Sequence, residues 1–115
     1  GTNRASVESD AVDLLAHPGL LTLVDARLAA ARGCYVEITT RKGHCLTNGH
    51  VARVCTLAGA KMVVNTDAHA PSDLVTLDFA RQVAAGAGLT EEAVLAATVT
   101  NPQELVLRIL AARQR

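Results

Sequence analysis

Three short apolar segments, separated by amphipathic segments of helical period, constrain the fold of this chain more than any other feature. The apolar segments cover residues 12–16, 34–38 and 61–65, and each is short enough to be a buried strand. Helical patterns run from 23 to 32 and from 49 to 58 between them. Because near-continuously apolar strands that alternate with helices are typical of parallel sheets, the pattern predicts an α/β fold with about three parallel strands and covering helices.

Local signals predict where the helices begin and end. Gly33 and Gly59 follow the first two helical patterns and are expected to end them. A short helix is expected over residues 2–10, ahead of the first strand. Residues with capping side chains are expected to open the longer helices, and these are Thr22, Asn48, Ser72 or Asp73, Thr90 and Asn101. Pro102 and Glu104 strengthen the last of these starts, so a separate final helix is predicted there.

Composition excludes several classes of protein. The 115 residues suit one domain or part of a larger one, and half of them are hydrophobic, which excludes a disordered chain. Lys plus Arg and Asp plus Glu both number 11, so the chain lacks the basic surface of a dedicated nucleic-acid binder. One Tyr, one Phe and no Trp offer few platforms for stacked bases. No apolar run approaches the ~20 residues that cross a membrane, so no membrane partner is expected.

The cysteines and the first residues predict a cellular setting. The chain has an odd number of cysteines and no C-x-x-C pair; the three are Cys34, Cys45 and Cys55. This predicts free thiols in a reducing cytoplasm. The chain starts at Gly1 without Met and without a signal-peptide pattern. We therefore expect a cytoplasmic location and a chain that is a fragment of a longer protein.

Histidine and acidic side chains follow the first and third predicted strands. His17 follows the first strand, before Pro18 and Gly19, and Asp67 and His69 follow the third. Because the carboxyl ends of parallel strands meet at one edge, we expect these side chains to gather there. Imidazole and carboxylate donors from separate strands suit a borderline divalent metal. A turn histidine at 17 and local amide contacts at Asp67 are the alternatives, and the combination favours the metal.

A short basic loop follows the second predicted strand. The loop and the helix start after it carry Arg41, Lys42, His44, Asn48 and His50. Such a run is usually solvated, but this position would also let Arg41 and helix-terminal amides hold a phosphate. The default for His50 is a surface histidine, with a contact at the sheet edge as the alternative. Glu37, inside the second strand, can orient a neighbouring basic group.

In chain order, these motifs resemble the later motifs of the polymerase and histidinol phosphatase (PHP) superfamily. The resemblance runs over nearly all of the chain and is carried by residues 15–19, 36–39 and 64–69, with a histidinol-phosphatase-like loop at 40–44 and 47–50. It implies a distorted, TIM-like (β/α) barrel with a two- or three-metal site that hydrolyses phosphoesters. The family's opening H-x-H strand and further His and Glu ligands are not present here. Residues 1–115 are therefore predicted to be the carboxyl-terminal portion of a single PHP-like barrel domain.

The resemblance also assigns the metal ligands. His17, Asp67 and His69 match metal-binding positions of the family. Histidine ligands favour manganese, zinc or iron, with magnesium as an alternative. Such metals would bind the substrate phosphate and activate a bridging water. The parent protein is therefore predicted to be a metal-dependent phosphoesterase, whereas autonomous activity of the 115-residue chain is left open.

The substrate would be a phosphorylated small molecule, handled by the loop after the second strand. Arg41 is expected to neutralise charge on the phosphoryl oxygens, and His44 to protonate the leaving group or hold the phosphate. Lys42, Asn48 and His50 are expected to contact the substrate together with Arg41. The polymerase-associated branch of the family is disfavoured by the zero net charge and the few aromatic residues.

Two other functions stay open. The chain can be a non-catalytic half-barrel that needs a complementary chain, and its open sheet edge would then allow pairing or self-association. It can also belong to an amidohydrolase-type metal-dependent hydrolase, which likewise uses His and Asp at strand ends. Metal content separates the first alternative from an enzyme, and a comparison of phosphomonoester with amide substrates separates the second.

Overall fold

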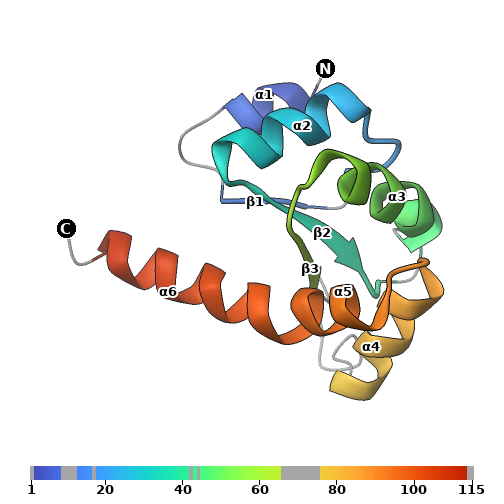
Figure 1. The fold of residues 1–115 in the computed structure, drawn as a ribbon. Coiled ribbons are helices and arrows are strands. Elements are labelled where there is room, and N and C mark those ends of the chain that lie inside the picture. The colour runs from blue at the N-terminus through green and yellow to red at the C-terminus, as the bar shows by residue number, and fades with distance from the viewer. Residues whose placement is uncertain are drawn as a thin grey trace.

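The computed structural model describes residues 2–8, 13–16, 18–41, 43, 45–65 and 76–113. The first half contains α1 (Thr2–Glu8), β1 (Leu14–Leu15), α2 (Leu23–Arg32), β2 (Tyr35–Thr39), the 3₁₀ turn η1 (Cys45–Thr47) and α3 (Asn48–Ala58). The second half contains β3 (Met62–Asn65), α4 (Leu77–Gly86), α5 (Glu91–Leu95), the π-helical turn η3 (Ala96–Thr100) and α6 (Asn101–Arg113). Helices therefore separate the strands in the predicted order (Figure 1).

The three strands form one parallel sheet in the order β1-β2-β3. Leu15 pairs with Val36 across the first strand pair, and Thr39 pairs with Asn65 across the second. The prediction of an α/β fold with three parallel strands and covering helices is confirmed. All three strands point the same way, so their carboxyl ends share one edge of the sheet.

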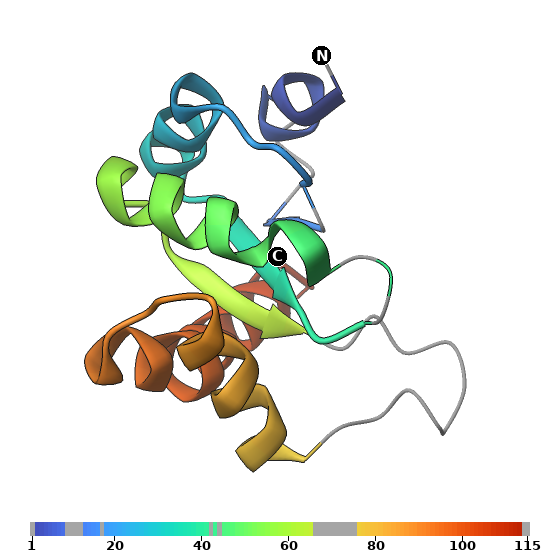
Figure 2. The ribbon, with the colours of Figure 1, turned by 90° about the vertical axis from the view of Figure 1, so that its right-hand side faces the viewer.

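Helices α2 and α3 cover one face of this sheet. Val36 and Ile38 of β2 are fully buried in a core that includes Ala26 of α2 and Val51 and Cys55 of α3. The small alanines of α2 let the helices approach the sheet closely, so an aliphatic core can be built with few aromatic rings. Figures 1 and 2 show α2 and α3 together on one side of the sheet and α6 on the other.

Helix α6 covers the opposite face, near the beginning of the strands. Tyr35 and Val63 form a second buried cluster with Leu105 of α6. Asn101, the first residue of α6, donates from Nδ2 to the carbonyl oxygen of Met62 at 2.8 Å. Because Tyr35 and Met62 begin β2 and β3, α6 is attached to the amino-terminal half of the sheet.

Several predicted helix boundaries are confirmed. The Thr22 hydroxyl accepts a hydrogen bond from the Asp25 amide, so Thr22 caps α2 as expected. Gly33 and Gly59 adopt left-handed conformations with φ of 68° and 73°, and they end α2 and α3. Thr90 caps α5 in the same way as Thr22 caps α2.

The prediction for the start of α4 is wrong. The helix begins at Leu77, after an extended Thr76 whose hydroxyl accepts from the Phe79 amide. Because Thr76 has an extended conformation, α4 cannot begin before Leu77. Ser72 and Asp73 lie outside the described residues, and neither of them opens α4.

The predicted separate start of α6 is also wrong. Asn101 has helical φ and ψ of −68° and −41°, and its N–H bonds the Ala96 carbonyl five residues earlier. The chain therefore passes from α5 through η3 into α6 without leaving a helical conformation. Pro102 explains the wide turn, because proline lacks an N–H and its ring would clash with the carbonyl four residues earlier. Where Asn101 was expected to cap, its side chain instead binds β3.

In the part of the chain that the structure describes, no helix is long and apolar enough to span a bilayer.

Candidate functional site

The carboxyl edge of the sheet is where the predicted site residues follow the strands. Leu15, Thr39 and Asn65 are the last residues of β1, β2 and β3, so the three predicted polar clusters leave neighbouring strands at one edge. Five predicted residues lie outside the described part of the chain, namely His17, Lys42, His44, Asp67 and His69. Their roles as metal ligands or substrate contacts stay predictions. Arg41, Asn48 and His50 are described.

Glu37 is a buried carboxylate in the central strand. Glu37 is only 1% exposed. Along β2 it alternates with Val36 and Ile38, which pack toward α2 and α3, so the Glu37 side chain lies on the other face of the sheet. Asn65 donates from Nδ2 to Glu37 Oε2 at 2.9 Å. Glu37 pairs in register with Val63, so this bond runs diagonally toward the carboxyl edge.

The sequence predicts Glu37 only as a residue that can orient a neighbouring basic group, and the predicted site does not include it. A signal was present, because a single charged residue interrupts the apolar segment 34–38. Charged residues are rarely fully buried unless they are paired or hydrogen-bonded. Sequence alone did not identify its partner, because the bond to Asn65 depends on the register between β2 and β3.

Asn48 joins the end of β2 to the start of α3. Its Oδ1 accepts from the Thr39 amide at 3.2 Å, and its Nδ2 donates to the Thr39 carbonyl at 2.7 Å. The predicted capping role is wrong, since Thr47 occupies the cap position and Asn48 is the first helical residue. At the buried end of β2, Thr39 offers a backbone N–H and a backbone carbonyl, and the single side-chain amide of Asn48 binds both. A substrate contact by Asn48 stays a prediction.

The loop after β2 begins with a tight contact. The Arg41 amide donates to the Thr39 hydroxyl at 3.1 Å, which turns the chain as it leaves the strand. The Thr40 hydroxyl is buried and has no hydrogen-bond partner among the described residues. Buried polar atoms are usually satisfied by protein, water or an ion. The expected role of the Arg41 guanidinium stays a prediction.

His50 fastens α3 to the segment between β1 and α2. Its Nε2 lies 2.6 Å from the Leu21 carbonyl oxygen. Because a carbonyl only accepts, Nε2 carries the proton in this contact. The ring therefore binds the backbone at Leu21, four residues after His17. The predicted contact between His50 and the substrate stays a prediction.

Two buried oxygen donors are described on β2 and just after it, the Glu37 carboxylate and the Thr40 hydroxyl. Within the described ranges, no three His, Cys, Asp or Glu side chains gather into a metal-binding group. The three predicted ligands, His17, Asp67 and His69, lie outside those ranges.

The amino-terminal end of the sheet carries a different cluster. Tyr35 donates to Glu104 Oε2 at 2.9 Å, and Lys61 contacts the same oxygen at 2.9 Å. These hydrogen bonds lower the pKa of Glu104 and raise that of Lys61, while burial and then the Glu104 bond raise the pKa of Tyr35. The Arg108 guanidinium lies 4.8 Å from the centre of the Tyr35 ring and binds the Gly33 carbonyl. This cluster fastens α6 to the sheet at the end opposite the predicted site.

The predicted free thiols are confirmed for all three cysteines. Burial raises the pKa of Cys34, and it raises the pKa of Cys55 to about 12. Thiolates are the reactive and metal-binding form of cysteine. Cys34 and Cys55 therefore behave as core residues.

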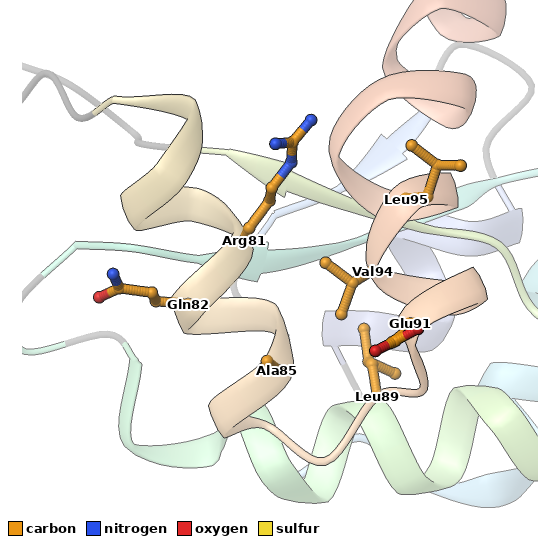
Figure 3. Close-up of a pocket in the computed structure, with 7 residues that line it drawn as sticks. All are labelled: Arg81, Gln82, Ala85, Leu89, Glu91, Val94 and Leu95. Atoms are coloured by element: carbon orange, nitrogen blue, oxygen red, sulfur yellow. The ribbon is translucent and has the colours of Figure 1, made fainter.

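A groove of about 380 Å³ lies between α4 and α5. Figure 3 shows Arg81 of α4 on one side and Val94 and Leu95 on the other, with Leu89 below them. None of the predicted site residues lines it. The groove is mostly apolar and open, and it is separate from the strand ends that carry the predicted chemistry.

By fold, this chain is an α/β protein with an open three-stranded parallel sheet. It is 43% identical over 108 residues to the uncharacterized protein MJ1295 of Methanocaldococcus jannaschii. The aligned region covers 94% of this chain and 50% of the relative, so the chain spans about half the length of the curated relative that it matches. No family model and no solved structure matches the chain.

Proposed function

We propose that this chain is part of a metal-dependent hydrolase of phosphoesters of the PHP type. The chain would contribute three strands of a distorted, TIM-like (β/α) barrel and part of its metal site. One observation supports this above the others. The EIT motif ends β2, and the HPG and DAH motifs follow β1 and β3 in the sequence, so the three motifs belong to three adjacent parallel strands of one sheet. Active sites of barrel enzymes are built from loops at this edge.

The residues of the chain take distinct roles in this proposal. His17, Asp67 and His69 would hold divalent metal, with manganese, zinc or iron favoured. When bound, such metal binds phosphate oxygens and lowers the pKa of water. Arg41 would stabilise charge on the phosphoryl group, and His44 would protonate the leaving group.

The start of α3 supports a phosphate site in the same region. Thr47 makes no side-chain hydrogen bond to the first turn of α3. The positive end of the helix dipole at a helix start attracts anions. Asn48 holds this helix start against the end of β2, next to the loop that carries Arg41 and Lys42. A phosphorylated small molecule is therefore the proposed substrate class.

A second candidate is a half-barrel without activity of its own. The chain covers only 50% of its relative, and the sheet formed by its described residues has three strands, whereas a closed TIM barrel has eight. In this case the chain would bind a complementary partner or a second copy. We place either protein in the cytoplasm, on the basis of its three free thiols.

The test measures metal content and hydrolysis together. The full native polypeptide is purified, its bound metals are quantified by mass spectrometry, and hydrolysis of p-nitrophenyl phosphate is followed with and without added Mn²⁺. An amide substrate is assayed in parallel. We expect metal-dependent phosphomonoester hydrolysis that Asp67→Asn or His69→Ala abolishes while the circular dichroism spectrum is unchanged.

Asp78→Asn provides the matched control, because Asp78 is an exposed carboxylate on α4. It should leave both metal content and rate unchanged. Retained activity in the Asp67 and His69 variants would refute the metal assignment. Less than one metal per chain with no hydrolysis would favour the half-barrel, and hydrolysis of the amide alone would favour an amidohydrolase.

A further inference from the structure

Helix α6 has an apolar surface on the side that faces away from the sheet. Leu105 and Ile109 pack toward the sheet at helical spacing. The outer row of α6 lies on the opposite side at spacings i, i+3, i+4 and i+7, and it consists of Gln103, Val106, Leu107 and Leu110. Leu107 is 66% exposed and Leu110 is 47% exposed. A second apolar face is typical of a helix that is covered on both sides, so a partner is expected on this row.

The last turns of α6 extend beyond the sheet. Figure 1 shows this end of the helix projecting to the left of the strands. Residues 110–113 are all exposed, so they gain little from packing within the described part of the chain. Most helices in proteins owe their stability to tertiary packing, so this end is suited to contact with another molecule. Arg113 adds a positive charge to it.

The groove between α4 and α5 complements the projecting end of α6 in shape and charge. Its apolar lining includes Val94, which is half-buried, and Leu95, which is 53% exposed. Glu91 also lines the groove and is exposed, as Figure 3 shows. Arg81 on the other wall lies 3.9 Å from Asp78 of its own helix, which balances its charge. The groove therefore offers an apolar wall and an acidic group to an apolar helix end that carries an arginine.

The groove and the projecting end lie at the two ends of one helical run. This run passes from Glu91 through α5, η3 and α6 to Arg113. Packed antiparallel about Pro102, two such runs set Arg113 of each copy opposite Glu91 of the other. The same register sets Leu110 opposite Val94. Because the same contact is then made twice, the pairing closes as a twofold dimer and leaves no further copy to add.

We propose that the outer row of α6 and the α4–α5 groove form the interface between two copies of this chain. The projecting end of α6 in one copy lies in the groove of the other, with its leucines on the apolar wall and Arg113 beside Glu91. The pairing leaves the sheet-facing side of α6 undisturbed, including Leu105. It does not depend on the proposed hydrolase chemistry, so either one can fail without the other.

The test measures the oligomeric state of the full native polypeptide by sedimentation equilibrium under reducing conditions. Leu107→Gln and Leu110→Gln remove apolar surface from the outer row while keeping a residue that favours helix. Leu57→Gln is the matched control, because Leu57 on α3 is 66% exposed, as Leu107 is. We expect the wild type and the control to dimerise equally. Each variant in the outer row should raise the dissociation constant of the dimer about 10- to 100-fold.

Charge reversal tests the register of the two helices. Glu91→Arg and Arg113→Glu each set like charges against one another and should weaken the dimer about 3- to 10-fold. The double variant restores opposite charges and should recover the wild-type dissociation constant, with circular dichroism verifying that each variant is folded. A double variant as weak as the single ones would overturn the pairing.

Two results with the other proteins would also overturn it. One is a wild-type polypeptide that stays monomeric at every concentration. The other is a dimer that Leu107→Gln and Leu110→Gln leave unchanged, which would place the contact on another surface, such as the edge of the sheet.

Discussion

Replacing one buried amide, Asn48→Asp, tests how the predicted site is held together. The change is nearly isosteric, but it removes the donor to the Thr39 carbonyl at 2.7 Å and sets two acceptors against each other. Loss of the hydrogen bond costs about 1 kcal/mol, and an unsatisfied buried acceptor costs about 1–3 kcal/mol more. We expect a loss of about 2–4 kcal/mol in the free energy of unfolding at pH 7. At about 4 °C per kcal/mol, the melting temperature should fall by about 8–16 °C.

The assay is urea unfolding followed by circular dichroism at pH 7 and pH 4.5. Burial and the facing carbonyl disfavour the charged form, so the introduced carboxyl has a pKa raised above its unfolded value. Its protonated form can donate to Thr39. The deficit relative to wild type should therefore be largest above the folded pKa and shrink as the pH falls. Thr47→Ala is the control and should change stability by less than about 0.5 kcal/mol, because that side chain makes no cap bond. An Asn48→Asp deficit that is absent at pH 7, or equal at both pH values, would refute the reasoning.

Two further predictions concern side chains of the core and of the loop. The rise in the pKa of Cys55 from 9.0 to about 12 lowers its thiolate fraction about 1000-fold at pH 8. Cys34 and Cys55 are also buried, whereas Cys45 is partly exposed. A thiol-specific chromogenic reagent should therefore modify Cys45 first, and Cys34 and Cys55 only after unfolding. Rapid labelling of all three thiols in the native protein would contradict the described core. Arg41→Ala should raise the KM for a phosphomonoester or lower kcat while leaving metal affinity intact, and unchanged kinetics would remove Arg41 from the site.

Elements with local signals were predictable from the sequence. The strands follow from short apolar segments, and the start of α2 follows from a hydroxyl cap at Thr22 whose partner is only three residues away. The same holds for the glycines that end α2 and α3, since the left-handed conformation at Gly33 and Gly59 is a property of the residue itself. Such features depend on neighbours in the sequence and need no knowledge of the tertiary structure.

The errors at Asn48 and Asn101 have one physical cause. Asn48 and Asn101 both have the chemistry of a helix cap, but their amides bind Thr39 and Met62, which lie 9 and 39 residues away. Buried strand ends need hydrogen-bond partners, and a nearby amide satisfies them before it caps its own helix. Glu37 was underrated for a related reason, since its partner Asn65 is brought close only by the register of β2 against β3. Contacts of this kind are set by tertiary structure.

The residues that attach α6 to the sheet lie at the amino-terminal end of the strands, and the proposed chemistry lies at the carboxyl end. Tyr35, at the start of β2, is bound to Glu104 and packed against Leu105 of α6, whereas Glu37 lies on the same face one step closer to the carboxyl edge. Because α2 and α3 cover the other face, the face with Tyr35 and Glu37 would become the interior of any barrel that this sheet helps to form. In that barrel α6 would close the amino-terminal mouth, and Glu37 would line the interior. Any complementary half would have to pack beside α6 without displacing Leu105, because Leu105 is packed against Tyr35.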